Sequence, residues 1–206
     1  MDEPYAIIDS MPYMESNWPA ALQTDAESRN KAKTWAKTMS NWMYMCYVVA
    51  MSLRPRPTEH DRFERFCCAL AFGVLPEEMA TPGTNYIRGF LTLFNRLVRI
   101  VGEAHEYPRL LLSYNSQANH SKIYESNFSE LSAGRKFCVT KRGFLAWVPR
   151  DTRLRDRICI VAGCAVLFVV RPVGQFYELL GDCYREDMTC EGSVVINQKP
   201  CSFVFR

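Results

Sequence analysis

The sequence predicts an α+β protein, with an N-terminal bundle of about four helices packed on a small C-terminal antiparallel β-barrel or curved sheet. A change of pattern along the chain supports this fold class. Up to residue 132, apolar side chains recur every three or four positions, as on the buried face of a helix. From Gly134 onward, short runs of β-branched and aromatic residues alternate with turn residues. With 206 residues and 48% hydrophobic content, the chain is expected to form one compact unit.

The chain is expected to begin with an arm, residues 1–23, which is rich in Pro and Met and lies against the surface. Thr24 and Glu27 have the three-residue spacing of a capping box, so the first helix is predicted to start there. The RPRP segment at residues 54–57 ends it, because proline lacks the amide donor and restricts its predecessor. The apolar residues of this helix recur at helical spacing: Trp35, Met39, Trp42, Met43, Cys46, Ala50 and Leu53.

Three further helices complete the helical part, residues 24–132. The second is predicted to start at Thr58 and to end before Pro76. The third is predicted over residues 85–105, where apolar side chains share one broad face. A fourth, with a weaker pattern, is predicted over residues 119–132.

The β part, residues 133–206, contains five predicted strands at the spacing typical of a small antiparallel barrel or a strongly curved sheet. They are KFCVT, FLAWV, RICIVAG, AVLFVVRPV and FYELLGDCY. The segment Lys141-Arg142-Gly143 is predicted to form a tight hairpin turn, and Gly163-Cys164 another turn. The final segment, CSFVFR, is a candidate for one more strand.

The charge and hydropathy of the chain exclude several classes of partner. The net charge is only +3, and basic residues are scattered among acidic ones, so no nucleic-acid partner is expected. No segment approaches about 18 uninterrupted apolar residues, so no membrane span is expected. The first residues lack the basic start and apolar run of a signal peptide, so a cytoplasmic location is expected.

The nine cysteines are expected to be mostly buried thiols. Their number is odd, and without an export signal they do not indicate a disulfide framework. Their spacings are irregular and the three histidines lie far from the C-terminal cysteines, so no metal site is expected. No glycine-rich phosphate loop is present, so no cofactor is expected either.

A series of short motifs crosses the β part. In order they are Lys141-x-Gly143-aromatic, Pro149 followed by Asp151-Thr152, Phe168-Val-Val-Arg171-Pro172, and Tyr177-Glu-Leu-Leu-Gly181-x-Cys-Tyr184. Together they resemble the C-terminal region of fungal heterokaryon-incompatibility proteins, the HET-domain family. The resemblance covers about a quarter of the chain and implies a HET-tail-like β part.

The chain departs from that family at several places. Trp147 lies in a segment where relatives usually have small residues, including glycine. Arg155 lies where they tend to have Gly. Tyr184 is followed by Arg185, where relatives often have a Tyr-x-His-Gly type ending. The HET domain that defines the family is not expected in this chain, which begins directly before the helical part. The activity of that domain is therefore not expected of this chain alone.

Conventional acid–base or nucleophilic catalysis has little support in the sequence. None of the histidines, His60, His105 and His120, lies beside a nucleophile signature. The segment NWMYMCYVV at residues 41–49 is different, because its large apolar side chains continue around the helix beyond one face. Such a surplus is used either as plain core or as the wall of a cavity for an apolar guest.

The leading hypothesis is a cofactor-independent enzyme of fungal secondary metabolism, a cyclase or pericyclase of the Diels–Alder type. It would hold an apolar terpenoid or polyketide-like substrate in a reactive shape, which lowers an entropic barrier without metal or acid–base pair. Arg171 and Tyr184 are the candidate catalytic hydrogen-bond donors. The candidate substrate-binding residues are Trp42, Met45, Tyr47, Trp147, Phe168 and Tyr177.

The alternative hypothesis is a non-enzymatic HET-related interaction or regulatory module that binds a protein partner. In this interpretation the aromatic residues are core, and Arg171 is a structural arginine paired with Asp156 or Glu178. The two hypotheses predict different side-chain environments. An enzyme requires a closed apolar pocket walled by the first helix, whereas a module has those side chains packed and an exposed apolar patch elsewhere.

Overall fold

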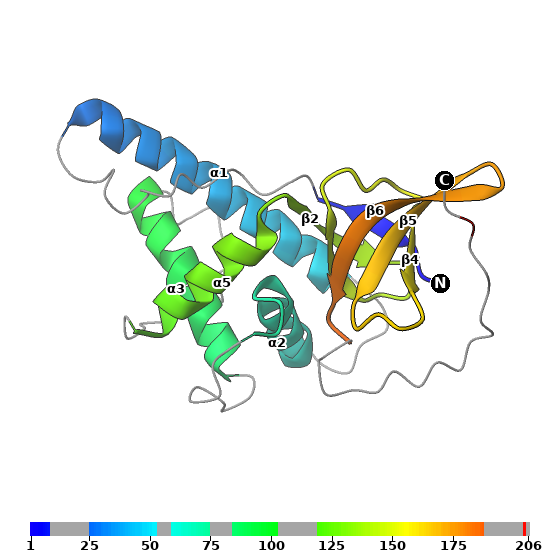
Figure 1. The fold of residues 1–206 in the computed structure, drawn as a ribbon. Helices are drawn as coiled ribbons and strands as arrows, with labels where there is room; N and C mark the ends of the chain where they lie inside the picture. The colour runs from blue at the N-terminus through cyan, green and yellow to red at the C-terminus, as the bar shows by residue number, and fades with distance from the viewer. Residues whose placement is uncertain (9–24, 53–58, 75–83, 103–118, 188–203, 205–206) are drawn as a thin grey trace. The chain divides into compact units, whose positions relative to one another are not determined.

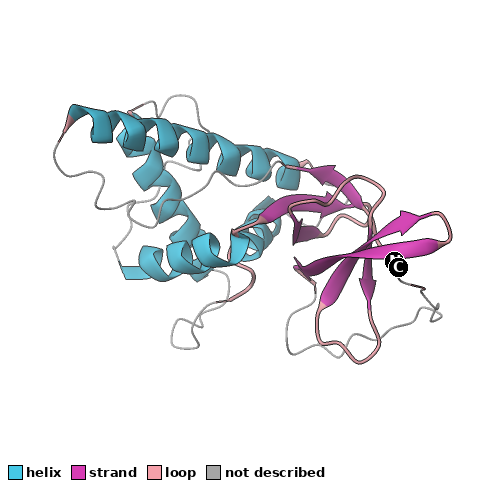
Figure 2. Cartoon of the chain, turned by 45° about the horizontal axis from the view of Figure 1, so that its top comes forward, coloured by secondary structure: helices cyan, strands magenta, loops and turns pink. Residues whose placement is uncertain are grey.

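The computed structural model describes residues 1–8, 25–52, 59–74, 84–102, 119–187 and 204. The chain divides into two compact units (Figure 1). The β unit comprises Met1–Ser10 together with Gly134–Arg206, and the helical unit comprises Met11–Ala133. The described helices all lie in the helical unit and the described strands all lie in the β unit (Figure 2). The predicted α+β class is therefore confirmed.

The helical unit contains four described helices: α1 (Ala26–Met51), α2 (Glu59–Leu70), α3 (Thr84–Val101) and α5 (Asn119–Ser132). Helix α3 contacts each of the other three. Each of the four predicted helices has a counterpart among the described residues, and the fourth has the predicted bounds. Helix α2 ends earlier than predicted, and the chain turns at Phe72 and Gly73, which both have positive φ angles.

Helix α1 begins one residue later than the capping box predicted. Its N-cap is Asp25, whose Oδ1 accepts a hydrogen bond from the Ser28 backbone N–H at 2.8 Å. An aspartate carboxylate satisfies a free N-terminal amide and is also favoured by the helix dipole. The helix ends at Met51, where the Ser52 N–H bonds back to the Val48 and Val49 carbonyls, shortly before the RPRP segment.

An aromatic cluster forms the centre of the helical unit. Tyr47 of α1 contacts Phe63 and Phe66 of α2 edge to face, at ring-centroid distances of 5.9 and 5.8 Å. Phe66 in turn contacts Phe90 of α3 at 5.1 Å. These edge-to-face distances are the favourable ones for aromatic pairs, which contribute beyond the area they bury. The large rings of the first three helices are thus used to join those helices.

The β unit is a six-stranded antiparallel sheet. Its strands are β1 (Pro4–Ile7), β2 (Arg135–Thr140), β3 (Leu145–Pro149), β4 (Arg157–Ile160), β5 (Leu167–Val173) and β6 (Phe176–Arg185). They lie in the order β1-β2-β3-β6-β5-β4. An isolated bridge joins the two edges of this sheet, because Asp2 exchanges backbone hydrogen bonds of 3.1 and 2.7 Å with Ile158. The sheet is therefore curled, as predicted, and partly closed.

The predicted strands all form, and the hairpin turn at Lys141-Arg142-Gly143 is confirmed, with Gly143 at φ +80°. No strand was predicted within the N-terminal arm. Pro4–Ile7 forms β1, paired with β2. The rest of the arm, and most of the CSFVFR segment, lie outside the described residues; the Val204 carbonyl accepts a hydrogen bond of 2.9 Å from the Tyr177 N–H.

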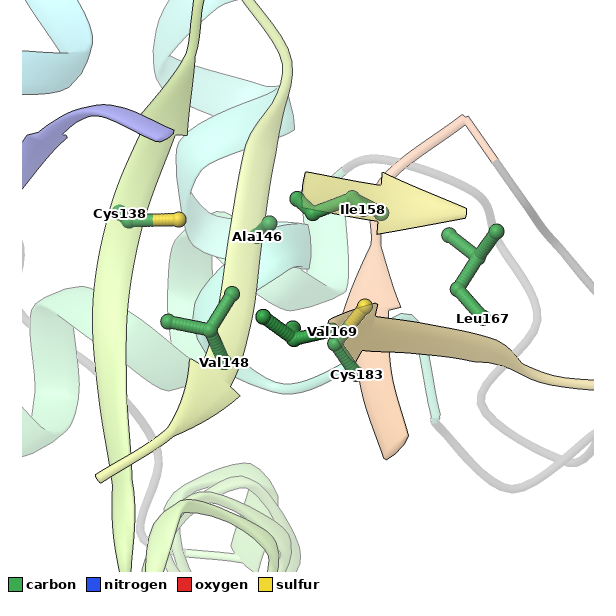
Figure 3. Close-up of a cluster of buried hydrophobic side chains, with 7 residues drawn as sticks. All are labelled: Cys138, Ala146, Val148, Ile158, Leu167, Val169 and Cys183. Atoms are coloured by element: carbon green, nitrogen blue, oxygen red, sulfur yellow. The ribbon is translucent and has the colours of Figure 1, made fainter. Parts of the chain in front are cut away.

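The core of the β unit lies inside the curl of the sheet (Figure 3). Its side chains come from strands β2 to β6: Cys138, Ala146, Val148, Ile158, Leu167, Val169 and Cys183. Because neighbouring residues of a strand point to opposite faces, Phe137 and Trp147 lie on the other face of β2 and β3. They too are fully buried, with their rings 5.4 Å apart.

Candidate functional site

The substrate-binding residues predicted in α1 have unequal environments. Trp42 is 7% exposed and its ring lies 6.1 Å from that of Phe128, while Tyr47 belongs to the aromatic cluster. Met45 is 50% exposed. Two of the three side chains are therefore packed among other side chains of the helical unit, and the third is largely exposed to solvent.

Three of the predicted residues in the β unit share one face of the sheet. Trp147 lies directly opposite Tyr184 on the neighbouring strand, and Phe168 lies opposite Asp182, two positions from Tyr184. Positions two apart on a strand face the same way, so these side chains lie on the face opposite the core. Trp147 is fully buried there, while Phe168 and Tyr184 are half-buried.

The two predicted catalytic donors are far apart. Arg171 is paired across the sheet with Glu178, whereas Tyr184 is near the other end of the same strand, β6. A strand rises about 3.3 Å per residue, so these positions are separated by about 20 Å. Arg171 and Tyr184 are therefore too far apart to act on one carbonyl group of a small substrate.

Arg171 holds the loop between β3 and β4. Its Nε and Nη2 donate to Asp156 Oδ1 and Oδ2 at 3.0 and 2.9 Å, and Nη2 also donates to the Asp151 carbonyl at 2.7 Å. The paired geometry is the strong form of arginine–carboxylate contact. The hydrogen bonds to Asp156, assisted by the charges of nearby carboxylates, raise the pKa of Arg171. The pairing with Asp156 is the one that the structural interpretation of Arg171 predicted.

Asp156 also fixes the turn in front of it. Its carboxylate is 4% exposed, and Oδ2 accepts a hydrogen bond of 2.7 Å from the Arg153 N–H. The Asp156 N–H donates back to the Arg153 carbonyl at 3.2 Å. A backbone hydrogen bond thus closes the turn from Arg153 to Asp156, and the hydrogen bonds from Arg171 hold the Asp156 carboxylate in place.

This turn borders a hollow of about 570 Å³, which is open to solvent. The volume is in the range of ligand pockets in proteins. The residues that line it are Glu3, Lys141, Arg153, Leu154, Arg155, Asp156, Arg157, Arg171 and Pro172. Five of these side chains are basic and two are acidic, so the hollow differs in character from the apolar cavity that the sequence predicted.

The carboxylates neutralise only part of the positive charge of the hollow. Glu3 forms a salt bridge with Lys141, and this hydrogen bond, assisted by the charges of Lys141, Arg157 and Arg155, lowers the pKa of Glu3. Asp156 pairs with Arg171. Arg157 donates to the Tyr177 hydroxyl at 3.0 Å and lies over the Tyr177 ring. Within the part of the chain that is described, Arg153 and Arg155 form no salt bridge with an acidic side chain.

Most of the residues that line this hollow are not among the predicted site residues. Arg153, Arg155 and Arg157 alternate along the chain, which is the signal that could have been used. The basic residues are scattered among acidic ones, which predicts no nucleic-acid partner, and no smaller anionic ligand is predicted from them. Glu3 and Lys141 could not have been added from the sequence, because β1 had not been recognised.

The cysteines of the described segments are free, and most are buried as predicted. Burial raises the pKa of Cys183 to about 12 and raises that of Cys46, Cys67 and Cys138 above their usual range. These thiols are protonated at neutral pH and are poor nucleophiles. Among the residues with a described position, no group of three His, Cys, Asp or Glu side chains could hold a metal ion.

The side chains of His60 and His120, and all of His105, lie outside what is described. No helix in the described ranges is both long and apolar enough to cross a membrane.

Comparison with known proteins gives one match. The family model described as the Het-6 beta-barrel domain matches residues 93–203, which is more than half of the chain. The match extends the relationship expected from the β motifs backward into α3. No curated protein and no solved structure matches the chain.

Proposed function

This chain belongs to the Het-6 beta-barrel domain family, and from that premise we propose that it is a heterokaryon-incompatibility-related interaction module that binds a protein partner. The proposal favours the second of the two hypotheses drawn from the sequence. The cyclase hypothesis stays a prediction. It requires that the aromatic side chains line a cavity and that the two donors reach one substrate.

The observation that carries the proposal is the packing of the aromatic side chains. Tyr47 is enclosed by the rings of α2, Trp42 lies against Phe128, and Trp147 lies against Phe137. Side chains that must join helices and strands are held by those contacts, and they are poorly placed to reshape around a flexible substrate. This packing is what the module hypothesis requires of them.

The positions of the two donors give independent support. A pericyclic reaction is accelerated when one or more donors converge on a single substrate group. Arg171 is engaged with Asp156 and Asp151, and Tyr184 lies about 20 Å away along the strand. A module does not require donors that converge on one group. In a module, Arg171 has the structural role of holding a surface loop.

Exposed side chains complete the argument for a partner. Leu154 and Leu179 of the β unit are 58% and 52% exposed, and Leu154 lines the charged hollow. An apolar side chain beside unneutralised arginines is typical of protein recognition surfaces, where apolar contact and charge act together. The hollow is therefore the surface at which we place the partner.

The test is made in the organism that encodes the chain, by deleting the gene and complementing it with a tagged copy. A module predicts an unchanged set of small cyclic metabolites in the deletion strain. It also predicts that cross-linking mass spectrometry finds the tagged chain joined to a second protein in stoichiometric amount. Loss of a cyclic metabolite on deletion, restored by the tagged copy, would favour the cyclase hypothesis and overturn the module.

A further inference from the structure

We propose that the charged hollow is the docking site for an acidic segment of the partner, and that Arg155 is the residue that determines its specificity. The inference rests on the proposed function and names the chemistry of the partner. The segment would carry two or more carboxylates next to an apolar side chain.

The charge of the hollow points to an anionic occupant. Lys141 and Arg171 each have a carboxylate partner, while Arg153 and Arg155 have none among the residues that the structure places. Among the residues that the structure describes, Arg157 donates to two neutral groups, the Tyr177 hydroxyl and the Met1 sulfur. Arginine guanidinium groups bind carboxylates in a paired geometry, so two or three carboxylates can be held here at once.

The backbone of Arg155 has an unfavourable conformation. Its φ angle is +77°, in the left-handed region that favours glycine, because the Cβ of any other residue crowds the backbone there. Arg155 and Phe72 are the two non-glycine residues with positive φ in the described segments. A glycine would serve the turn better, so the arginine side chain must contribute something other than stability.

The turn that carries Arg155 is rigid. Asp156 closes it through the Arg153 N–H, and Arg171 fixes Asp156 with two hydrogen bonds. A side chain displayed from such a turn loses little further freedom of the backbone when it binds a ligand. Arg155 thus lines the hollow from a turn whose backbone is fixed before the partner arrives.

The shape and lining of the hollow favour a peptide over a small phosphate compound. The hollow is open, which suits a passing chain segment, whereas small ligands are usually bound in sites that cover most of their surface. Leu154 is 58% exposed, and both Leu154 and Pro172 line the hollow. These two side chains offer apolar contact that a phosphate group cannot use and that a peptide with an apolar residue can.

The probe is a short fluorescein-labelled peptide in which Asp and Glu residues flank one Leu, and its binding to the full chain is followed by fluorescence anisotropy. Arg155→Gly removes the guanidinium and the strain, and Arg155→Ala removes the guanidinium but keeps the strain. Arg155→Lys keeps a positive charge. Arg150→Ala removes an exposed arginine that does not line the hollow, and is the matched control.

We expect Arg155→Gly and Arg155→Ala to weaken peptide binding equally, by about tenfold or more, the loss of a charge-assisted hydrogen-bond pair. Arg155→Lys should lose less, and Arg150→Ala should stay within about twofold because of screening by salt. Arg155→Gly should raise the midpoint of thermal unfolding by about 2–4 °C, while Arg155→Ala leaves it unchanged. The melting curves also establish that each variant is folded.

Three outcomes would overturn the inference. One is equal peptide binding by wild type and Arg155→Gly. Another is displacement of the peptide by inorganic pyrophosphate at concentrations at or below the Kd of the peptide, which would identify a phosphate site. The third is persistence of the cross-linked partner complex when the deletion organism is complemented with the Arg155→Gly gene. In that case the module proposal would remain, but this docking site would not.

Discussion

At the scale of single residues, Asp156 has the largest structural role in the loop beside the hollow. Both carboxylate oxygens accept hydrogen bonds from Arg171, and one of them also accepts from the Arg153 N–H. The carboxylate is nearly buried while the Arg171 side chain is 21% exposed. Removing Asp156 would leave the Arg153 backbone amide without this acceptor and would leave the partly buried Arg171 guanidinium without its carboxylate partner, although the bond to the Asp151 carbonyl remains.

We therefore predict that Asp156→Ala lowers the free energy of unfolding by about 2–4 kcal/mol. Glu178→Ala is the matched control, because Glu178 is exposed and faces Arg171 across the sheet. An exposed charge of that kind is expected to contribute about 1 kcal/mol or less. Urea unfolding followed by circular dichroism measures both. Equal losses in the two variants would contradict the role of Asp156.

Glu3 gives a prediction about pH. The hydrogen bond from Lys141 and the nearby arginines lower its pKa below the ordinary value of 4.5. A carboxyl whose pKa is lower in the folded state stabilises the fold above its unfolded pKa, and the stabilisation is lost as the pH falls through the folded value. The wild-type protein should therefore be more stable than Glu3→Gln at pH 7, and this difference should shrink as the pH is lowered from 7 to below 4.5. A difference in urea midpoint that is constant between these pH values would contradict the ion pair.

At the scale of helices and strands, most of the fold could be predicted from the sequence, because local periodicity indicates most of the elements. Helix α3 has a broad apolar face, and strands β2 to β6 are β-rich runs between turn residues. Strand β1 has neither signal. It is four residues long, begins with Pro4 and contains an irregularity between Pro4 and Ala6. Its stability comes from pairing with β2, a contact distant in sequence that no local pattern encodes.

The candidate site was less predictable for the same reason. The pairing of Arg171 with Asp156 was foreseen as an alternative, since opposite charges close in sequence were available. The hollow itself is assembled from β1, from the hairpin turn at Lys141, from the loop before β4 and from the end of β5. Only the folded sheet brings these segments together. The interpretation of the aromatic residues as a cavity wall came from the spread of large apolar side chains around the first helix, a pattern that does not distinguish wall from core.

The packing of α3 against α5 gives a prediction with an unusual sign. A Cβ added to Gly89 would meet Tyr124 side-chain atoms at 2.6 to 2.7 Å, and Tyr124 is fully buried, with its hydroxyl bonded to the Cys67 carbonyl. Replacing a helical glycine by alanine normally stabilises a helix by about 1 kcal/mol. Here we expect Gly89→Ala to destabilise by about 1–3 kcal/mol, because the two helices must separate.

Thr92→Ala is the control on the same helix, since Thr92 is half-buried and its hydroxyl donates to the Arg88 carbonyl one turn earlier. Thermal and urea unfolding of both variants measure the change in stability relative to wild type. A more stable Gly89→Ala protein would show that α3 and α5 are not in the close contact described.

At the scale of the whole molecule, the β unit is built from both ends of the chain. Residues Met1–Ser10 supply β1 and the bridge from Asp2 to Ile158, while the other strands follow Gly134. Contacts so distant in sequence form late, because a long loop must be closed before they are made. The same closure places Glu3 beside Lys141, so the hollow is complete only when the N-terminal segment has joined the sheet.

The central claim is that the large aromatic side chains are structural core and not the walls of a substrate cavity. The most direct test is the stability of Trp147→Ala, because Trp147 is fully buried and packs on Phe137. The account predicts a loss of about 3–5 kcal/mol in the free energy of unfolding. Tyr5→Ala, at a site 68% exposed in the same unit, should change it by no more than about 0.5 kcal/mol. A Trp147→Ala protein as stable as wild type would mean that the indole lines a space, and would contradict the account.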